Sequence, residues 1–400
     1  MSDRVVIVSA TRTPIGAMQG SLSSLQGHEL GSIAIRGALA NAKLPPTAID
    51  EVLMGCVLPA GQGQAPARQA ALNAGLPPGT GATTLNKVCG SGMKAAMLAH
   101  DLIVAGSQEV VLAGGMESMS NAPYLLSRAR GGYRYGHGTV FDHMALDGLE
   151  DAYDKLPNGG GKSMGQFAEI CARKFEFSRQ EQDAYALESS KRARHANESG
   201  LFEWEISPVT VKGRGGDTII DKDESPFKIN PDKVPKLKPA FEADGTVTAA
   251  TSSSISDGAA ALVMMRESTA SKLGLNPIAA FIAHATHAQT PEWFTTAPVG
   301  AITKLQAKTG WQSRDIDLFE INEAFAVVAM ATMREHDIAH KRINVHGGAV
   351  ALGHPIGASG ARLIVTLLGA LRQTGGKRGV ASLCIGGGEA TAVAVEMLDS

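Results

Sequence analysis

The sequence has almost no net charge and no long hydrophobic run. Its 37 lysine and arginine residues are balanced by 39 aspartate and glutamate residues, so the formal net charge is -2 at pH 7. Such a chain has no overall field to attract nucleic acid or an anionic membrane surface. No run approaches the ~18 consecutive apolar residues that a membrane span requires. The sequence therefore favours a small-molecule partner over nucleic acid or a membrane.

Cysteine is also scarce. Four cysteines occur in 400 residues, and no two of them form a CxxC pair. A chain of this size does not need disulfides, so this usage is typical of a reducing compartment. Ligand pairs with the spacing of a zinc site are missing too, and no metal is predicted. The chain passes from Met1 almost directly into an apolar run at residues 5–8, which leaves no room for a secretion signal. We expect a cytoplasmic protein.

Length and pattern predict two domains of the α/β class. A chain of 400 residues with 44% hydrophobic residues is too long for a typical single-core domain. A short apolar run at 110–114 follows an alanine-rich helical stretch at 93–105, and such alternation is typical of buried strands between helices. We place an N-terminal half at 1–270 and a C-terminal half at 271–400. The proline-rich and charged stretch at about 120–250 is interpreted as a loop domain inserted in the first half.

An internal similarity supports two halves. Residues 90–95 read Gly-Ser-Gly-Met-Lys-Ala, and residues 358–362 read Ala-Ser-Gly-Ala-Arg. Each segment opens a helical stretch, ending near Gly106 or Gly375, which leads to a strand and a Gly-Gly pair. The repeat predicts topologically similar halves, and chance similarity of two βαβ units is the competing interpretation.

The residues around Cys89 favour a reactive thiol. Residues 86–93 read Asn-Lys-Val-Cys-Gly-Ser-Gly-Met, which places this cysteine at a strand-to-helix junction beside residues too small to shield it. Unpaired N–H groups and the helix dipole favour an anion there. We therefore expect a thiolate that forms more easily than the free-thiol pKa of ~8.5 indicates. The alternative is a small buried hydrophobic residue.

Two motifs in the C-terminal half also indicate chemistry. His354 precedes a proline and follows a glycine, so it is held extended and is positioned as a general base; a structural histidine bonding its own loop is the alternative. Cys384 ends an apolar strand, and three glycines begin at Gly386. Backbone N–H groups of such a turn can stabilise an oxyanion, although glycine is also used simply for positive φ.

Asn322 and Glu323 are polar residues that interrupt an apolar stretch. If they are buried they need hydrogen-bond partners, and Asn322 could hold a water or a carbonyl. A helix N-cap is the competing interpretation of Asn322.

Six segments together resemble the signature segments of the thiolase family. They occur in family order and span essentially the whole chain: residues 86–93, 114–120, 245–261, 322–326, 347–362 and 384–388. Coincidence at six long motifs is not credible. The resemblance implies a thiolase fold, a five-layered αβαβα core of two similar halves with an inserted loop domain.

The resemblance also implies roles for these residues. Cys89 becomes acylated, His354 activates it, and Cys384 handles the substrate α-proton. The N–H groups of Cys89 and Gly386 form one oxyanion hole, and His354 with a water held by Asn322 forms the other. The expected reaction is the reversible Claisen condensation of two acetyl-CoA to acetoacetyl-CoA and CoA, with ping-pong kinetics through an acyl-enzyme. Coenzyme A is then substrate and product, and no cofactor is expected.

For substrate binding, the resemblance places pantetheine beside Ser253. The residues expected along its path are Leu149, Met164, Phe241, Ala324 and Phe325. Lys228 is expected to approach the nucleotide phosphates of CoA. Ser163 stands where short-chain biosynthetic members usually have histidine. Phe294 and His346 resemble the mitochondrial acetoacetyl-CoA thiolase, a potassium-binding subgroup, but no monovalent cation is predicted here.

Two other functions compete with this interpretation. A broader 3-ketoacyl-CoA thiolase of fatty-acid β-oxidation would use the same residues with a longer pocket. A non-catalytic acyl-CoA or lipid-binding protein on the same fold would need none of Cys89, His354 and Cys384. Residues 128–151 resemble the segment through which bacterial thiolases form tetramers, so we expect a homotetramer that is a dimer of dimers.

Overall fold

The fold is built around a ten-stranded sheet. The computed structural model describes residues 3–156 and 160–398. The strand order is β14-β15-β16-β13-β1-β12-β5-β3-β4, with β2 paired to β12. These strands are β1 (Val5–Arg12), β2 (Gly16–Ala17), β3 (Glu51–Gly55), β4 (Gly81–Leu85), β5 (Val110–Ser118), β12 (Ser256–Arg266), β13 (Ala279–Ala288), β14 (Leu318–Ile321), β15 (Arg378–Ile385) and β16 (Glu389–Met397). The strands of the two halves meet where β1 pairs with β13.

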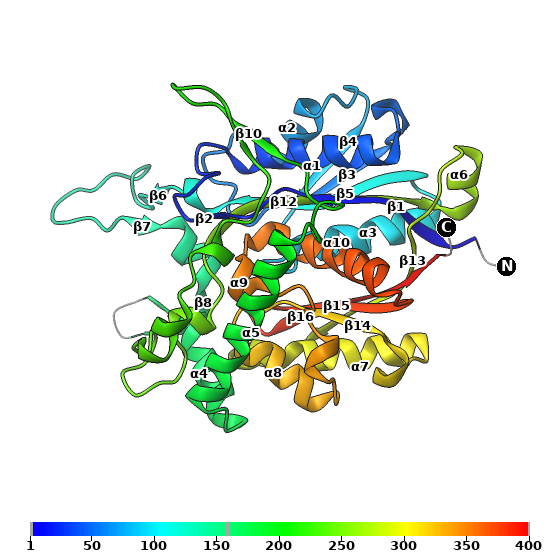
Figure 1. The fold of residues 1–400 in the computed structure, drawn as a ribbon. Coiled ribbons are helices and arrows are strands. Elements are labelled where there is room, and N and C mark those ends of the chain that lie inside the picture. Colours follow the sequence, from blue (N-terminus) through cyan, green and yellow to red (C-terminus); the bar gives the residue numbers. More distant parts are fainter. Residues whose placement is uncertain (1–2, 157–159, 399–400) are drawn as a thin grey trace.

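Helices lie on both faces of each part of this sheet. In Figure 1, α1 and α2 cover the strands of the first half, α3 and α10 lie between the two groups of strands, and α7 and α8 cover the second. The helices are α1 (Gly27–Ala42), α2 (Pro66–Asn73), α3 (Ser91–Ala105), α4 (Met164–Lys174), α5 (Arg179–Glu198), α6 (Glu267–Lys272), α7 (Ala297–Thr309), α8 (Ala326–Glu335), α9 (Ala349–Leu352) and α10 (Ile356–Thr374). The predicted five-layered αβαβα core is confirmed.

The central strands are apolar on both faces because helices cover both faces. Every residue of β1 and of β5 is buried, and so is β12 up to its last residue. Strands in this environment read as continuous apolar runs, without the alternation of a half-exposed strand. This is why the sequence shows β5 as the run beginning at residue 110.

The two middle helices touch each other through glycine. A Cβ atom on Gly360 would lie 2.3 Å from the Met93 nitrogen, and one on Gly92 would lie 2.8 Å from the Ala361 nitrogen. Real side chains are excluded at these distances, so the repeated Ser-Gly pattern lies where the two helix backbones meet. The helix ends predicted near Gly106 and Gly375 are confirmed, since both glycines cap their helices in the left-handed conformation.

By length and composition alone, residues Val88–Ala105 could cross a membrane. Half of that window is buried inside the protein, and α3 packs against α10 and β5. It therefore has the character of a core helix.

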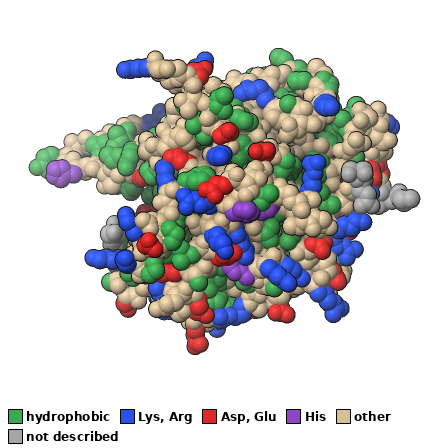
Figure 2. Space-filling model, viewed as in Figure 1, with side chains coloured by type: hydrophobic (Ala, Val, Ile, Leu, Met, Phe, Trp, Pro, Cys, Tyr) green, Lys and Arg blue, Asp and Glu red, His purple; other side chains and the backbone are tan. Residues whose placement is uncertain are grey.

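A long insertion separates β5 from its neighbour in the sheet, β12. It contains α4 and α5 and the short strands β6 (Tyr124–Leu125), β7 (Phe141–Asp142), β8 (Glu150–Lys155), β9 (Gly161–Ser163), β10 (Val209–Val211) and β11 (Thr218–Ile220). The β6–β7 arm projects from the body (Figure 1), and hydrophobic side chains are visible on it in Figure 2. The domain boundary near residue 270 stays a prediction.

Candidate active site

A strained turn carries Cys89 from β4 to α3. Val88, the residue before it, has a φ of 46°, which is a costly conformation for a β-branched side chain. Local hydrogen bonds hold the turn. The Val88 N–H donates to Asn86 Oδ1 at 2.8 Å, and Ser91 Oγ accepts from the Lys87 N–H at 2.8 Å while donating to the Val88 carbonyl at 2.6 Å. The turn therefore fixes the direction of the Cys89 side chain before the helix begins.

Cys89 lines a cavity of about 270 Å³, together with His354 and Gly386. Burial raises the pKa of the Cys89 thiol to about 11, although the backbone N–H groups of Gly386 and of Cys89 itself favour the thiolate. Our prediction of an easily formed thiolate is wrong for the unliganded protein, because desolvation outweighs these N–H groups. A thiol in this state needs a base.

The imidazole of His354 is held in one orientation. Its Nδ1 lies 2.6 Å from Ser359 Oγ, and that hydroxyl donates its own proton to the Pro355 carbonyl at 2.9 Å. The Ser359 oxygen must therefore accept a hydrogen bond from Nδ1–H, which leaves a lone pair on Nε2. Burial, reinforced by the positive charge of Arg362, lowers the pKa of His354 to about 3. The histidine is thus neutral, and the lone pair on Nε2 can accept a proton.

Asn322 provides the partner of Nε2. Its Nδ2 lies 3.3 Å from His354 Nε2, and its Oδ1 lies 3.5 Å from Nη2 of Arg362. The N-cap interpretation of Asn322 is wrong, because α8 begins at Ala326 with Phe325 at its N-cap position. The predicted water beside Asn322 stays a prediction.

Glu323, which follows Asn322, connects two segments of the chain through hydrogen bonds. Its carboxylate accepts hydrogen bonds from the hydroxyls of Tyr185 and Ser189 and from the amide of Asn344. The partners that we predicted for a buried Glu323 are therefore present. They tie the Asn322 segment to α5.

Cys384 lies near the end of β15, close enough to Cys89 for the two thiols to interact electrostatically, but it is not among the residues that line the cavity. It is fully buried, and burial together with the neighbouring Cys89 raises the pKa of its thiol. Two residues later, Gly386 reaches the cavity wall, and Gly387 and Gly388 continue with φ of 90° and 87°. Only glycine adopts such a turn readily, and the turn directs the Gly386 N–H at the Cys89 sulfur.

Six of the seven predicted binding residues line the same cavity: Ser253, Leu149, Met164, Phe241, Ala324 and Phe325. Lys228 is not among the lining residues, and its ammonium group pairs with Glu224. Its contact with CoA stays a prediction. Ser163 and Phe294 also line the cavity, whereas His346 does not.

Sequence reasoning missed several lining residues and one buried carboxylate. The lining residues that were missed are Gly148, Gly165 and Ile356, whereas Ser252 and Ile255 belong to the same loop as the predicted Ser253. Glu117 accepts hydrogen bonds from the N–H groups of Val57, Leu58 and Gly357, so it joins the segment after β3 to the start of α10. Burial raises its pKa to about 7. The sequence does carry a signal for Glu117, because a charged residue within a strand-like apolar run indicates a buried carboxylate.

Comparison with known proteins agrees with this geometry. A family model described as "Thiolase, N-terminal domain" matches residues 5–268, and one described as "Thiolase, C-terminal domain" matches residues 275–397. The chain belongs to the thiolase family. The family that the sequence motifs indicated is therefore confirmed.

Individual thiolase relatives match over the whole chain. "Acetyl-CoA acetyltransferase 2" of Arabidopsis thaliana is 51% identical over 397 residues, which is 98% of this chain and 97% of the relative. "Acetyl-CoA acetyltransferase B, mitochondrial" of Xenopus laevis is 50% identical over 398 residues, 99% of this chain and 92% of the relative. The crystal structure of Acat5 thiolase from Ascaris suum in complex with coenzyme A superposes with a TM-score of 0.92 at 41% identity, covering 99% of this chain and 100% of that one.

Proposed function

We propose that this thiolase is an acetyl-CoA C-acetyltransferase, which condenses two acetyl-CoA molecules to acetoacetyl-CoA and CoA, reversibly. The names of the similar proteins support this reaction. The observation that carries it is the convergence on one cavity of Cys89, the Gly386 N–H and a neutral His354, with the Cys384 thiol close to Cys89.

In the first step, the Cys89 sulfur attacks the thioester carbon of acetyl-CoA. Nε2 of His354 takes the thiol proton as the new C–S bond forms, so that no free thiolate is needed beforehand. The carbonyl oxygen becomes negative and is stabilised by the N–H groups of Cys89 and Gly386. When the bond to CoA breaks, the proton passes from His354 to the CoA sulfur, and Cys89 is left acetylated.

In the second step, another acetyl-CoA is deprotonated at its α-carbon. Cys384 first gives its thiol proton to Nε2 of His354, and the resulting thiolate takes the α-proton while protonated His354 and Asn322 stabilise the enolate oxygen. The enolate carbon then attacks the acetyl group on Cys89, and the Cys89 sulfur leaves with the bonding electrons and regains a proton from His354. Acetoacetyl-CoA is released. The reverse sequence cleaves acetoacetyl-CoA with CoA.

The cavity supports a short acyl group. Its volume of about 270 Å³ lies just below that of typical ligand sites, which commonly span about 300–1,000 Å³. Aromatic rings restrict it, since Phe294 and Phe241 each pack edge-on against Phe325. A long 3-ketoacyl chain would have to displace these rings.

Comparison of kcat/KM for acetoacetyl-CoA and for a 3-ketoacyl-CoA of eight carbons tests the proposal. We expect the shorter substrate to be cleaved more efficiently. A clear preference for the longer one would assign the protein to β-oxidation. No turnover of either substrate by the folded protein would favour the non-catalytic acyl-CoA-binding alternative.

We also propose an assembly and a location for this protein. The β6–β7 arm exposes apolar side chains, including Tyr124, Leu126 and Tyr135, which supports a homotetramer held together through this arm. All four cysteines are free, which supports a reducing cytoplasmic location and a place in fatty acid metabolism there. Light scattering after gel filtration measures the mass, and a monomer mass would contradict the tetramer.

A further inference from the structure

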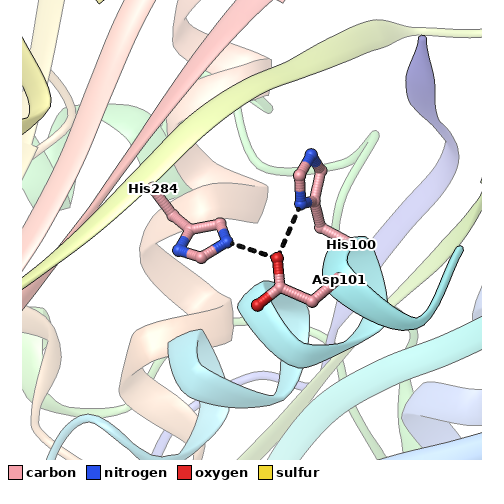
Figure 3. A group of neighbouring side chains, drawn as sticks. All are labelled: His100, Asp101 and His284. Atoms are coloured by element: carbon pink, nitrogen blue, oxygen red, sulfur yellow. Dashed lines mark hydrogen bonds and ion pairs between the residues drawn. The ribbon is translucent and has the colours of Figure 1, made fainter. Parts of the chain in front are cut away.

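A second cluster of ligand-type side chains lies away from the cavity. His100 and Asp101 lie near the end of α3, and His284 lies on β13, 183 residues after Asp101. Figure 3 shows both imidazoles turned toward one carboxylate oxygen. His284 Nε2 is 2.8 Å and His100 Nδ1 is 3.1 Å from Asp101 Oδ1, and the three ligand atoms all lie within 4.8 Å of one another.

Neighbouring rings hold these imidazoles in place. Phe281 stacks on His100 with ring centroids 5.0 Å apart, and the His284 ring meets the His100 ring edge-on at 5.3 Å. The side chains of the two histidines are 19% and 16% exposed, whereas that of Asp101 is 50% exposed. The nitrogens are therefore shielded and preoriented, while the carboxylate leaves a route from solvent.

The protonation states suit a cation. Burial lowers the pKa of His284, against the opposing hydrogen bond to Asp101. Burial opposes ionisation of Asp101, but hydrogen bonds from His284 and His100 lower its pKa overall. A neutral imidazole and an ionised carboxylate are the forms that bind metals. The positive charge of Lys308 is also near, and its ammonium group donates to the His284 carbonyl at 2.8 Å.

We propose that His100, Asp101 and His284 bind one divalent transition-metal ion, with Zn²⁺ as the best fit. Two imidazole nitrogens and one carboxylate oxygen suit this class of ion, with bonds of about 2.0–2.2 Å. Mg²⁺ and Ca²⁺ prefer sites made of oxygen. Ligands around a tetrahedral ion with such bonds lie about 3.3 Å apart, so small side-chain rotations complete the site. Solvent water fills the remaining positions.

The ion would join the two halves of the molecule. α3 begins beside Cys89 in the first half, and β13 pairs with β16, the partner of the strand that carries Cys384. A ligand that binds only the folded form stabilises it. The bound ion would therefore link α3 of the first half to β13 of the second.

Titration of the intact protein with Co²⁺, followed by competition with Zn²⁺, tests this site. Co²⁺ held by nitrogen and oxygen gives d–d bands without the sulfur-to-metal charge-transfer band that a cysteine ligand adds. We expect one Co²⁺ ion per chain, with d–d bands and no sulfur-to-metal charge-transfer band. Loss of a single outer partner of a metal ligand already weakens metal sites by about 10–100-fold, so His284→Gln should lower the affinity at least about 10-fold.

The matched control is His137→Gln, which changes an exposed histidine in the β6–β7 arm and should leave the affinity unchanged. Asp101→Asn keeps the side-chain shape and answers the question if His284→Gln does not fold, as judged by circular dichroism. Equal metal affinity in the wild type and both cluster variants overturns the site. A spectrum dominated by sulfur charge transfer also overturns it, because the ion would then belong to the cysteines.

Discussion

The two helices of the middle layer begin alike and do different work. α3 and α10 each carry a Ser-Gly pair at their start, and at Gly92 and Gly360 their backbones meet. The serines differ in what they bind. Ser91 fastens the turn that presents Cys89, whereas Ser359 orients the imidazole of His354.

This difference between the two serines shows which residues of the repeated Ser-Gly pattern are needed for the fold. The glycines are required by contact between the helices, so they recur in both halves. The serine hydroxyls are not used in that contact, and each half uses its own for a different local purpose. In the proposed mechanism, one half therefore supplies the nucleophile, and the other supplies the base and the second thiol.

Replacement of the sulfur of Cys89 or Cys384 by oxygen should give the largest effect and should distinguish the roles of the two halves. We expect Cys89→Ser and Cys384→Ser each to lower overall condensation by about 10³-fold or more, because nucleophilic and acid/base steps depend on them. Only Cys384→Ser should keep the exchange of label between acetyl-CoA and CoA, which needs acylation alone. Cys171→Ser, which changes a buried thiol of the same hydrophobic cluster as Cys384 that does not line the cavity, is the control. Loss of exchange in Cys384→Ser would contradict the division of roles.

The pH dependence of alkylation probes the same contrast. Because the pKa of Cys89 is raised to about 11, the thiolate fraction should grow about tenfold per pH unit between pH 7 and 10. Inactivation by iodoacetamide should follow this slope without a plateau. A plateau below pH 9 would show that the pKa of Cys89 is lower than this, as the helix dipole and the nearby N–H groups alone would predict. Cys384, fully buried, should react more slowly than Cys89 throughout.

Removal of the two serine hydroxyls should have unequal effects on catalysis. Ser359→Ala leaves the Nδ1–H of His354 without its acceptor. A lost hydrogen bond of a buried group costs about 1–3 kcal/mol, so we expect kcat to fall by about 10–100-fold. Ser91→Ala should instead lower the free energy of unfolding, because it frees the N–H and C=O groups of the Cys89 turn. Steady-state kinetics and urea unfolding measure the two quantities. Equal losses of kcat in both variants would remove the distinction.

The helix contact itself gives the smallest expected effect. Gly360→Ala places a methyl group against the backbone of Met93 and should lower the free energy of unfolding by about 1–3 kcal/mol. Gly79→Ala is the control, since a Cβ there meets nothing within 4 Å, and it should stay within about 0.5 kcal/mol of the wild type. Unchanged stability in Gly360→Ala would mean that the helices can separate.

Much of this arrangement could be predicted from the sequence. The strands of the sheet follow from short continuous apolar runs, and the middle helices follow from the alanine-rich stretches between them. The motifs around Cys89, His354 and Cys384 led to the site because glycine turns and a proline restrict those positions. The thiolase family followed from the motifs together, not from any one of them.

Other features depend on contacts that the sequence does not display. The raised pKa of Cys89 follows from how deeply the cavity is buried, which no local motif encodes. The link from Ser359 to His354 lies within one motif, yet the direction of the hydroxyl depends on the Pro355 carbonyl. The cluster of His100, Asp101 and His284 brings together residues 183 positions apart, so no spacing rule could find it.

Peptide mass spectrometry after brief exposure to acetyl-CoA tests the central claim most directly, since it locates the acetyl group. The account predicts one acetyl group per chain on the peptide that contains Cys89, removed again by added CoA. An acetyl group on the peptide that contains Cys384, or none on either peptide while the protein turns over, would contradict it.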